Sequence, residues 1–142
     1  MFTQQLMLNG FRDILFIMTR YEKGKKTIED IQERPVEEIF EGLEDIAPDL
    51  SRFVIEFPYS EIYTREGVEL KTREICTVAA LTVLGTIPQL KDHINAALNV
   101  GNSPTEIVEI IMQMSAYCGF PKAINGMVAA KEVFAERDLL PL

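Results

Sequence analysis

Apolar positions in the second half of the chain recur at the spacing of amphipathic helices. The clearest case is "SPTEIVEIIMQMSAYCGFP", residues 103–121, in which apolar side chains return every three or four positions. Ser103 and Glu106 stand where a capping box begins a helix. A glycine then ends the pattern and a proline follows it, as at a helix boundary. The segment therefore predicts one helix over 104–118 and a second that starts at Pro121.

A second segment, "KTREICTVAALTVLG", is apolar almost all round between Ile75 and Leu84. A helix without a polar face must be buried on every side. In a chain of this size, that pattern predicts either the centre of a helical bundle or an interface between subunits. The next segment, "PQLKDHINAALNVG", predicts another helix, starting at Pro88.

The first half of the chain is more broken. Prolines interrupt its pattern at Pro35, Pro48 and Pro58. They predict three short helices, at roughly 36–46, 49–57 and 59–64. Thr27 followed by Asp30 resembles a further helix cap. Because helix signals recur and strand signals do not, we expect an all-α fold, a compact helical bundle.

Length and charge place the chain in a broad class. Its 142 residues predict one domain with a real core, in which residues 1–20 form an N-terminal extension and 21–142 the body. A net charge of −8 argues against nucleic-acid binding, which needs clustered Lys and Arg. The longest uncharged run, from Ile75 to Leu90, is too short to span a bilayer, and the N-terminus lacks the features of a signal peptide. We expect a cytoplasmic protein with no nucleic-acid or membrane partner.

The first candidate for chemistry is His93, the only histidine in the chain. It lies on the apolar stripe of its predicted helix, three residues after Leu90 and four before Ala97, and therefore faces inward. An imidazole titrates near neutrality, so any proton transfer at pH 7 points to this residue first. A metal site is not indicated, because no second histidine stands at ligand spacing. The alternative is a hydrogen-bonded core or interface histidine.

The second candidate is Glu74, at the start of the apolar segment. A carboxylate that leads into a buried helix needs a partner. His93, Arg73 and Lys71 are available to it. The alternative is a carboxylate that interacts only with the dipole at the helix N-terminus.

The remaining candidates are cysteines and aromatic residues. Cys76 and Cys118 form no redox or zinc Cys-x-x-Cys motif, and we expect both to be unpaired, largely buried thiols without catalytic duty. Several aromatic residues could line a substrate pocket, although core packing is the alternative. They are Tyr117 and Phe120, with Phe57, Tyr59 and Tyr63.

From Leu70 to Glu136 the sequence resembles the carboxymuconolactone decarboxylase family. The matching stretches are "LKTREICTVAALTVLG" and "PQLKDHINAALNVGNSPTEIVEIIMQMSAYCGFPKAINGMVAAKEVF", with "RYEKG" at 20–24 as a looser match. The resemblance implies a bundle of the alkylhydroperoxidase-like type, assembled as a homotrimer or homohexamer. It also implies a lyase that removes CO₂ from a small carboxylated lactone without a cofactor.

The same superfamily contains alkylhydroperoxidase-like proteins, whose site is a Glu, a Cys-x-x-Cys and a His. On this chain the Glu matches Glu74 and the His matches His93, but the cysteine positions fall on Thr86 and Gln89. A dithiol cycle needs both sulfurs. The resemblance therefore implies a Glu74/His93 proton relay in a decarboxylase. Arg73, Tyr117 and Phe120 are the candidates for substrate contacts. The alternatives are an oxidoreductase that uses Cys76 or Cys118, and a non-catalytic oligomeric paralogue.

An acidic protein that binds an acidic substrate also needs local positive charge. The candidates in the sequence are Arg73, Lys91 and Lys122.

Overall fold

The computed structural model describes residues 18–142, and this part of the chain contains helices and no strand. The elements are α2 (Arg20–Gln32), α3 (Val36–Ile39), α4 (Pro48–Val54), the π-helix η1 (Ile55–Ile62), α5 (Leu70–Leu84), α6 (Ile87–Asn99), α7 (Pro104–Cys118) and α8 (Phe120–Glu136). The all-α prediction is confirmed for these residues. Most of the predicted N-terminal extension, 1–20, lies outside them.

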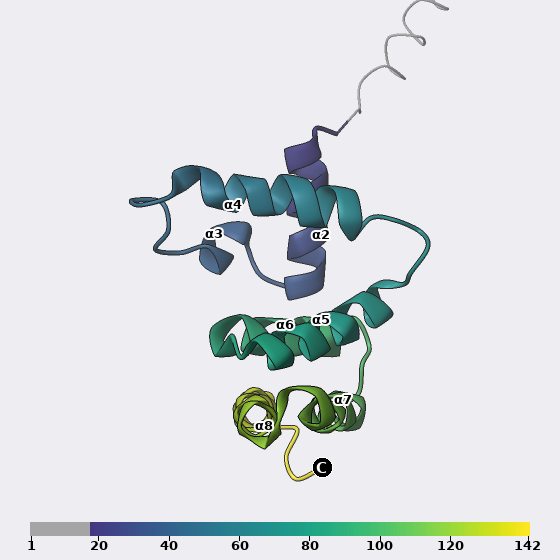
Figure 1. The fold of residues 1–142 in the computed structure, drawn as a ribbon. Helices are drawn as coiled ribbons and strands as arrows, with labels where there is room; N and C mark the ends of the chain where they lie inside the picture. Colours follow the sequence, from purple (N-terminus) through teal and green to yellow (C-terminus); the bar gives the residue numbers. More distant parts are fainter. Residues whose placement is uncertain (1–17) are drawn as a thin grey trace, which may run out of the picture.

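The helices are stacked in layers (Figure 1). One layer holds α2, α3, α4 and η1, the next holds α5 and α6, and the last holds α7 and α8. Two apolar clusters join these layers. Val78, Leu90, Ile111 and Phe134 belong to the cluster between α5, α6, α7 and α8, and Ile28, Ile55 and Ala96 belong to the cluster between α2, η1 and α6. Helix α6 contributes to both clusters and is therefore the middle of the molecule.

Local capping signals set α7 where the sequence predicts it. At the start of α7, the Ser103 hydroxyl accepts from the backbone of Glu106, and the Glu106 carboxylate accepts from the backbone of Ser103. Gly119 ends α7 with φ of 81°, a conformation that glycine adopts without steric cost. The predicted bounds 104–118 are confirmed.

The beginning of α2 differs from the prediction. Thr19, and not Thr27, caps this helix, in a full capping box with Glu22. Thr27 lies inside α2, where its hydroxyl donates to the carbonyl of Lys23. Both threonines have an acid three residues later, so the local pattern could not tell the two positions apart.

The boundary predicted at Pro58 is wrong, because the chain continues through it. Helix α4 runs directly into η1, which contains Pro58, so the helices expected at 49–57 and 59–64 are one continuous element. The wider turn of a π-helix relieves the clash between a proline ring and the preceding turn, which would otherwise break an α-helix. The segment expected to form a helix at 36–46 is mostly turns, with only the short α3 at its start.

Helix α5 is buried on one face only. Its buried residues are Glu74, Val78 and Thr82, at a spacing of four. Thr72, Cys76, Ala80 and Leu84 are exposed on another side. Within one chain, α5 is therefore not buried on every side, because only one of its faces packs on α6, α7 and α8. The alternative, that α5 contributes to an interface between subunits, stays a prediction. No helix in the range 18–142 is both long and apolar enough to cross a membrane.

Candidate active site

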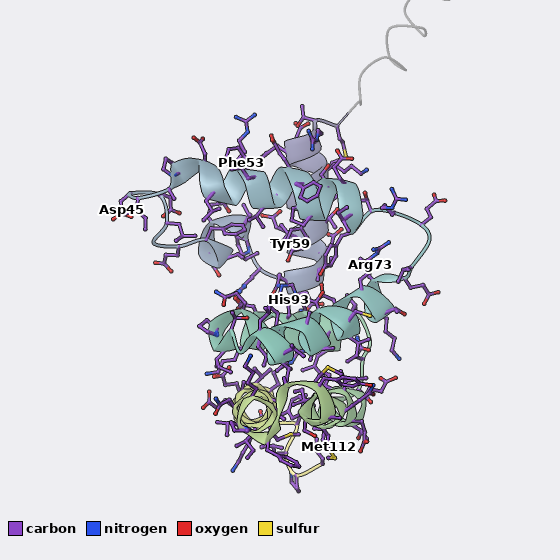
Figure 2. The ribbon with its side chains drawn as sticks, in the orientation of Figure 1. Asp45, Phe53, Tyr59, Arg73, His93 and Met112 are labelled. Carbon is purple, nitrogen blue, oxygen red and sulfur yellow. The ribbon has the colours of Figure 1, made fainter. Side chains whose placement is uncertain are left out.

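His93 and Glu74 meet between the α2/η1 layer and the α5/α6 layer. His93 Nδ1 lies 2.7 Å from Glu74 Oε2. Figure 2 shows His93 at this junction, below Tyr59. The predicted contact between the two side chains is therefore present in the structure. Because an ionised carboxylate only accepts hydrogen bonds, Nδ1 carries the proton whenever Glu74 is charged.

The Glu74 carboxylate is fully buried. Its side chain has no exposed surface, whereas 17% of the His93 side chain is exposed. A buried carboxylate without a partner is strongly unfavourable, and the imidazole supplies that partner. The other oxygen, Oε1, has no hydrogen-bond partner within the described chain. The imidazole thus binds Glu74 through Nδ1. Its other nitrogen, Nε2, has no protein partner among residues 18–142.

A largely apolar cavity of about 260 Å³ lies beside His93. We call it the His93 pocket. Its apolar walls come from α2, from η1 and from the segment between α2 and η1; they are Ile28, Ile39, Phe40, Leu43, Val54 and Tyr59. Its polar lining consists of Gln32, Gln89, Asp92 and His93. A titratable imidazole at the edge of a mostly apolar pocket is the usual arrangement of a site for a small substrate.

Tyrosines of η1 and the turn after it flank the buried carboxylate. The rings of Tyr59 and Tyr63 lie 4.9 Å apart, and the Tyr63 hydroxyl is 2.9 Å from the Thr77 hydroxyl. Burial raises the pKa of both phenols well above the ordinary value, and the negative charge of nearby Glu74 acts in the same direction. Both side chains therefore stay neutral and able to donate hydrogen bonds at physiological pH.

The three residues predicted to contact the substrate, Arg73, Tyr117 and Phe120, lie away from the His93 pocket in the structure. The Arg73 guanidinium donates to the carbonyls of Val68 and Arg65, at 3.0 and 2.9 Å, and so secures the loop before α5. Tyr117 and Phe120 are 75% and 72% exposed at the turn between α7 and α8. None of the three lines the His93 pocket of the same chain.

The cysteines are free, as predicted, but the prediction that both are largely buried is wrong. Cys76 is exposed and Cys118 is half-buried. Cys76 lies two positions after Glu74, so the helical turn directs it to the opposite face of α5. Of the two positions that align with the dithiol, Gln89 lines the His93 pocket and Thr86 is exposed at the start of α6.

Sequence reasoning did not single out Gln32 and Asp92. Both line the His93 pocket, and Gln32 is almost fully buried at the end of α2. Asp92 could have been noticed as the immediate neighbour of His93. No local signal marks Gln32, because only the packing of α2 on α6 brings it here. Among residues 18–142, no group of three or more His, Cys, Asp or Glu side chains could hold a metal ion.

Comparisons with known proteins agree on one family. Residues 48–132 match the Carboxymuconolactone decarboxylase family. The chain is 32% identical over 123 residues to 4-carboxymuconolactone decarboxylase of Acinetobacter baylyi, with 86% of this chain and 92% of that protein covered.

Two further relatives extend this comparison. A 15.0 kDa protein from the nqo9-nqo10 intergenic region of Paracoccus denitrificans, itself uncharacterised, is 34% identical over 99 residues, which cover 68% of this chain and 74% of that protein. A nitrosuccinic acid decarboxylase of Metarhizium robertsii is 25% identical over 79 residues, with 56% and 55% covered. Two of these three relatives are named as decarboxylases, which supports a decarboxylase-like function.

Proposed function

Because the chain belongs to the carboxymuconolactone decarboxylase family, we propose that it is a decarboxylase acting on a small carboxylated lactone or a related acid. The observation that carries this proposal is the contact of 2.7 Å between His93 and the buried Glu74 at the edge of an apolar pocket. The reaction needs a group that donates a proton near neutral pH. In the His93 pocket, the imidazole of His93 is the side chain suited to this role.

In the proposed reaction, the bond between the substrate carboxylate and its carbon breaks and CO₂ leaves. The electron pair that remains is delocalised onto the carbonyl of the unsaturated lactone. His93, protonated on both ring nitrogens, then delivers its Nε2 proton to carbon and afterwards takes up a proton from solvent. Glu74 accepts the hydrogen bond from Nδ1 and so directs Nε2 at the substrate. The apolar walls exclude water from the carboxylate that is lost, and the chemistry uses no cofactor.

The test is a direct assay of CO₂ release. The purified protein is incubated with 4-carboxymuconolactone and, separately, with nitrosuccinic acid, the two acids in the names of its relatives. We expect release of one CO₂ per molecule of at least one of them. Consumption of alkyl hydroperoxide with a dithiol donor, together with no CO₂ release from either acid, would instead support the oxidoreductase alternative.

We also propose that the chain assembles into a homotrimer or homohexamer. Large apolar side chains are exposed along α8 at a spacing of four residues: Phe120, Ile124 and Val128. Tyr117 of α7 and Leu84 of α5 are 75% and 65% exposed. Exposed apolar surface of this extent is typical of an interface.

Light scattering coupled to size exclusion should therefore give the mass of three or six chains of 16.1 kDa. The same measurement on Ile124→Glu should give smaller species, because a carboxylate in a closed apolar interface is unfavourable. A monodisperse single chain for the wild type would contradict the assembly.

A further inference from the structure

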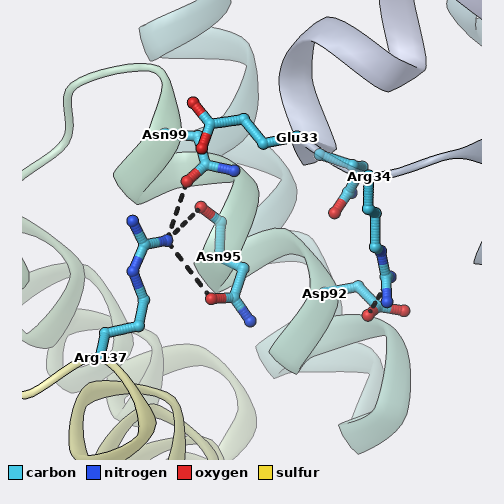
Figure 3. A pocket seen from close by; sticks show the side chains of 7 residues that line it. Glu33, Arg34, Asp92, Asn95, Asn99 and Arg137 are labelled. Atoms are coloured by element: carbon cyan, nitrogen blue, oxygen red, sulfur yellow. Dashed lines mark hydrogen bonds and ion pairs between the residues drawn. The ribbon is translucent and has the colours of Figure 1, made fainter.

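A second cavity, more polar than the first, adjoins the His93 pocket. Its volume is about 300 Å³, and we call it the arginine cavity (Figure 3). Its lining includes two arginines, Arg34 and Arg137, which come from the segment after α2 and from the end of α8. Gln32 and Asp92 line both cavities, so the two are neighbours. A ligand group in the arginine cavity is therefore within reach of a molecule that reacts at His93.

The guanidinium of Arg34 is held next to this junction by Asp92. The terminal nitrogen Nη2 of Arg34 lies 2.7 Å from Asp92 Oδ1. The two side chains are 35% and 41% exposed, so this ion pair is partly solvated and contributes little to stability. A guanidinium has five N–H donors, and the bond to Asp92 uses one of its nitrogens. Arg34 therefore keeps donors for a second carboxylate.

The three cations that the sequence offered as candidates are engaged away from both cavities. Arg73 holds the loop before α5, Lys91 pairs with Glu132, and Lys122 donates to the carbonyl of Val83 at 2.7 Å. Among residues 18–142, Arg34 and Arg137 are the Lys or Arg side chains that line either cavity.

Arg137 lies further along α6 than Arg34 does. Its Nη1 donates to Asn99 Oδ1 at 2.8 Å and lies near two oxygens of Asn95, as Figure 3 shows. These acceptors are neutral, so Arg137 has no carboxylate partner in the described chain. Glu33 also lines the cavity, so two arginines and two carboxylates, Glu33 and Asp92, surround a bound ligand. Asn95 and Asn99 lie one and two helical turns beyond Asp92 on α6. Arg137 is therefore farther than Arg34 from a ligand in the His93 pocket.

We propose that Arg34 recognises a carboxylate of the substrate that is retained in the product. This inference rests on the proposed function and names the residue that binds the second carboxylate of a diacid substrate. One carboxylate lies against the apolar walls beside His93 and is lost as CO₂. The other forms charge-assisted hydrogen bonds with Arg34 in the arginine cavity, where Asp92 is the resident competitor for the same guanidinium.

The experiment uses two stable probes, γ-butyrolactone-γ-acetic acid, which carries an acid on the side chain and no carboxylate on the reacting ring carbon, and the uncharged γ-butyrolactone. Neither has the unsaturation that the proposed reaction needs, so binding is measured without turnover. The readout is the NMR signal of the imidazole, which is unambiguous because His93 is the only histidine. We expect the wild type to bind the acid at least about tenfold more tightly than the neutral lactone, as one charged hydrogen-bonded contact predicts.

Two variants test the roles of the ion pair. Arg34→Gln should bind both probes equally, whereas Asp92→Asn, which removes the competing carboxylate, should bind the acid more tightly than the wild type does. A purely structural ion pair would give losses of the same sign in both variants. Arg52→Gln is the matched control, because Arg52 of α4 pairs with Glu56 of η1 and lines neither cavity. This variant should keep the wild-type preference.

The proposal is overturned if the wild type does not prefer the acid, if Arg34→Gln keeps the preference, or if Asp92→Asn loses it. This result is independent of the decarboxylation assay. If the protein prefers the acid through Arg34 but releases no CO₂, the proposed function is contradicted and the carboxylate-binding role of Arg34 is retained. Turnover with a KM unchanged in Arg34→Gln would contradict the binding role alone.

Discussion

His93→Gln is expected to lower kcat for decarboxylation by about a hundred- to ten-thousand-fold, the usual contribution of a positioned general acid. Glutamine keeps the approximate size of the side chain and can still donate to Glu74, but it cannot deliver a proton. Because 17% of the His93 side chain is exposed and its ring bonds only to Glu74 among residues 18–142, the fold and the subunit mass should change little. Steady-state kinetics, circular dichroism and light scattering measure these effects.

The matched control for this variant is Lys91→Gln, which lies on the same helix and pairs with Glu132 on the protein surface. Its kcat should stay within about twofold of wild type, because a surface ion pair contributes little. Retention of more than about a tenth of wild-type turnover by His93→Gln would be inconsistent with the proton-transfer role.

A double-mutant cycle tests whether Glu74 acts through His93. Glu74→Gln should also reduce kcat, but its effect should nearly vanish in the His93→Gln background, because the carboxylate positions a group that is no longer there. Losses that simply add would show that the two side chains act separately, and would remove the relay from the mechanism.

Gly24→Ala is expected to destabilise the protein by about 3 kcal/mol or more, although alanine normally favours a helix interior. An added Cβ at this position in α2 would lie 2.0 Å from the Ile55 carbonyl oxygen and 2.8 Å from its carbon. Both are backbone atoms, so relief requires α2 and η1 to move apart. Such a shift would also disturb Tyr59 and the His93 pocket. Thermal denaturation should show a Tm about 10 °C lower, at roughly 2–4 °C per kcal/mol.

Gly67→Ala is the control for this substitution, because a Cβ there has no atom within 4 Å. Its Tm should stay within a few degrees of wild type. A Gly24→Ala protein as stable as the wild type would show that the backbones of α2 and η1 do not approach as closely as the structure has them.

Features set by residues a few positions apart could be predicted from the sequence. The capping box of Ser103 and Glu106 and the stop at Gly119 define α7, because each involves hydrogen bonds or backbone angles within one turn. The inward position of His93 follows from helical spacing alone. The pairing of His93 with Glu74, nineteen positions earlier, could also be predicted, because a buried carboxylate needs a partner and the sequence offers few candidate partners.

Other features depended on contacts between distant segments, which no local pattern records. The π-helix that carries the chain through Pro58 packs on α2, and the close approach of Gly24 to Ile55 is part of that packing. Once α2 and η1 lie over α6, they bring Gln32 and Tyr59 to His93 and leave Arg34 paired with Asp92 at the adjoining cavity. The walls of the pocket are thus a product of packing between layers, because side chains from separate segments enclose a cavity only after each helix has a definite position on its neighbours.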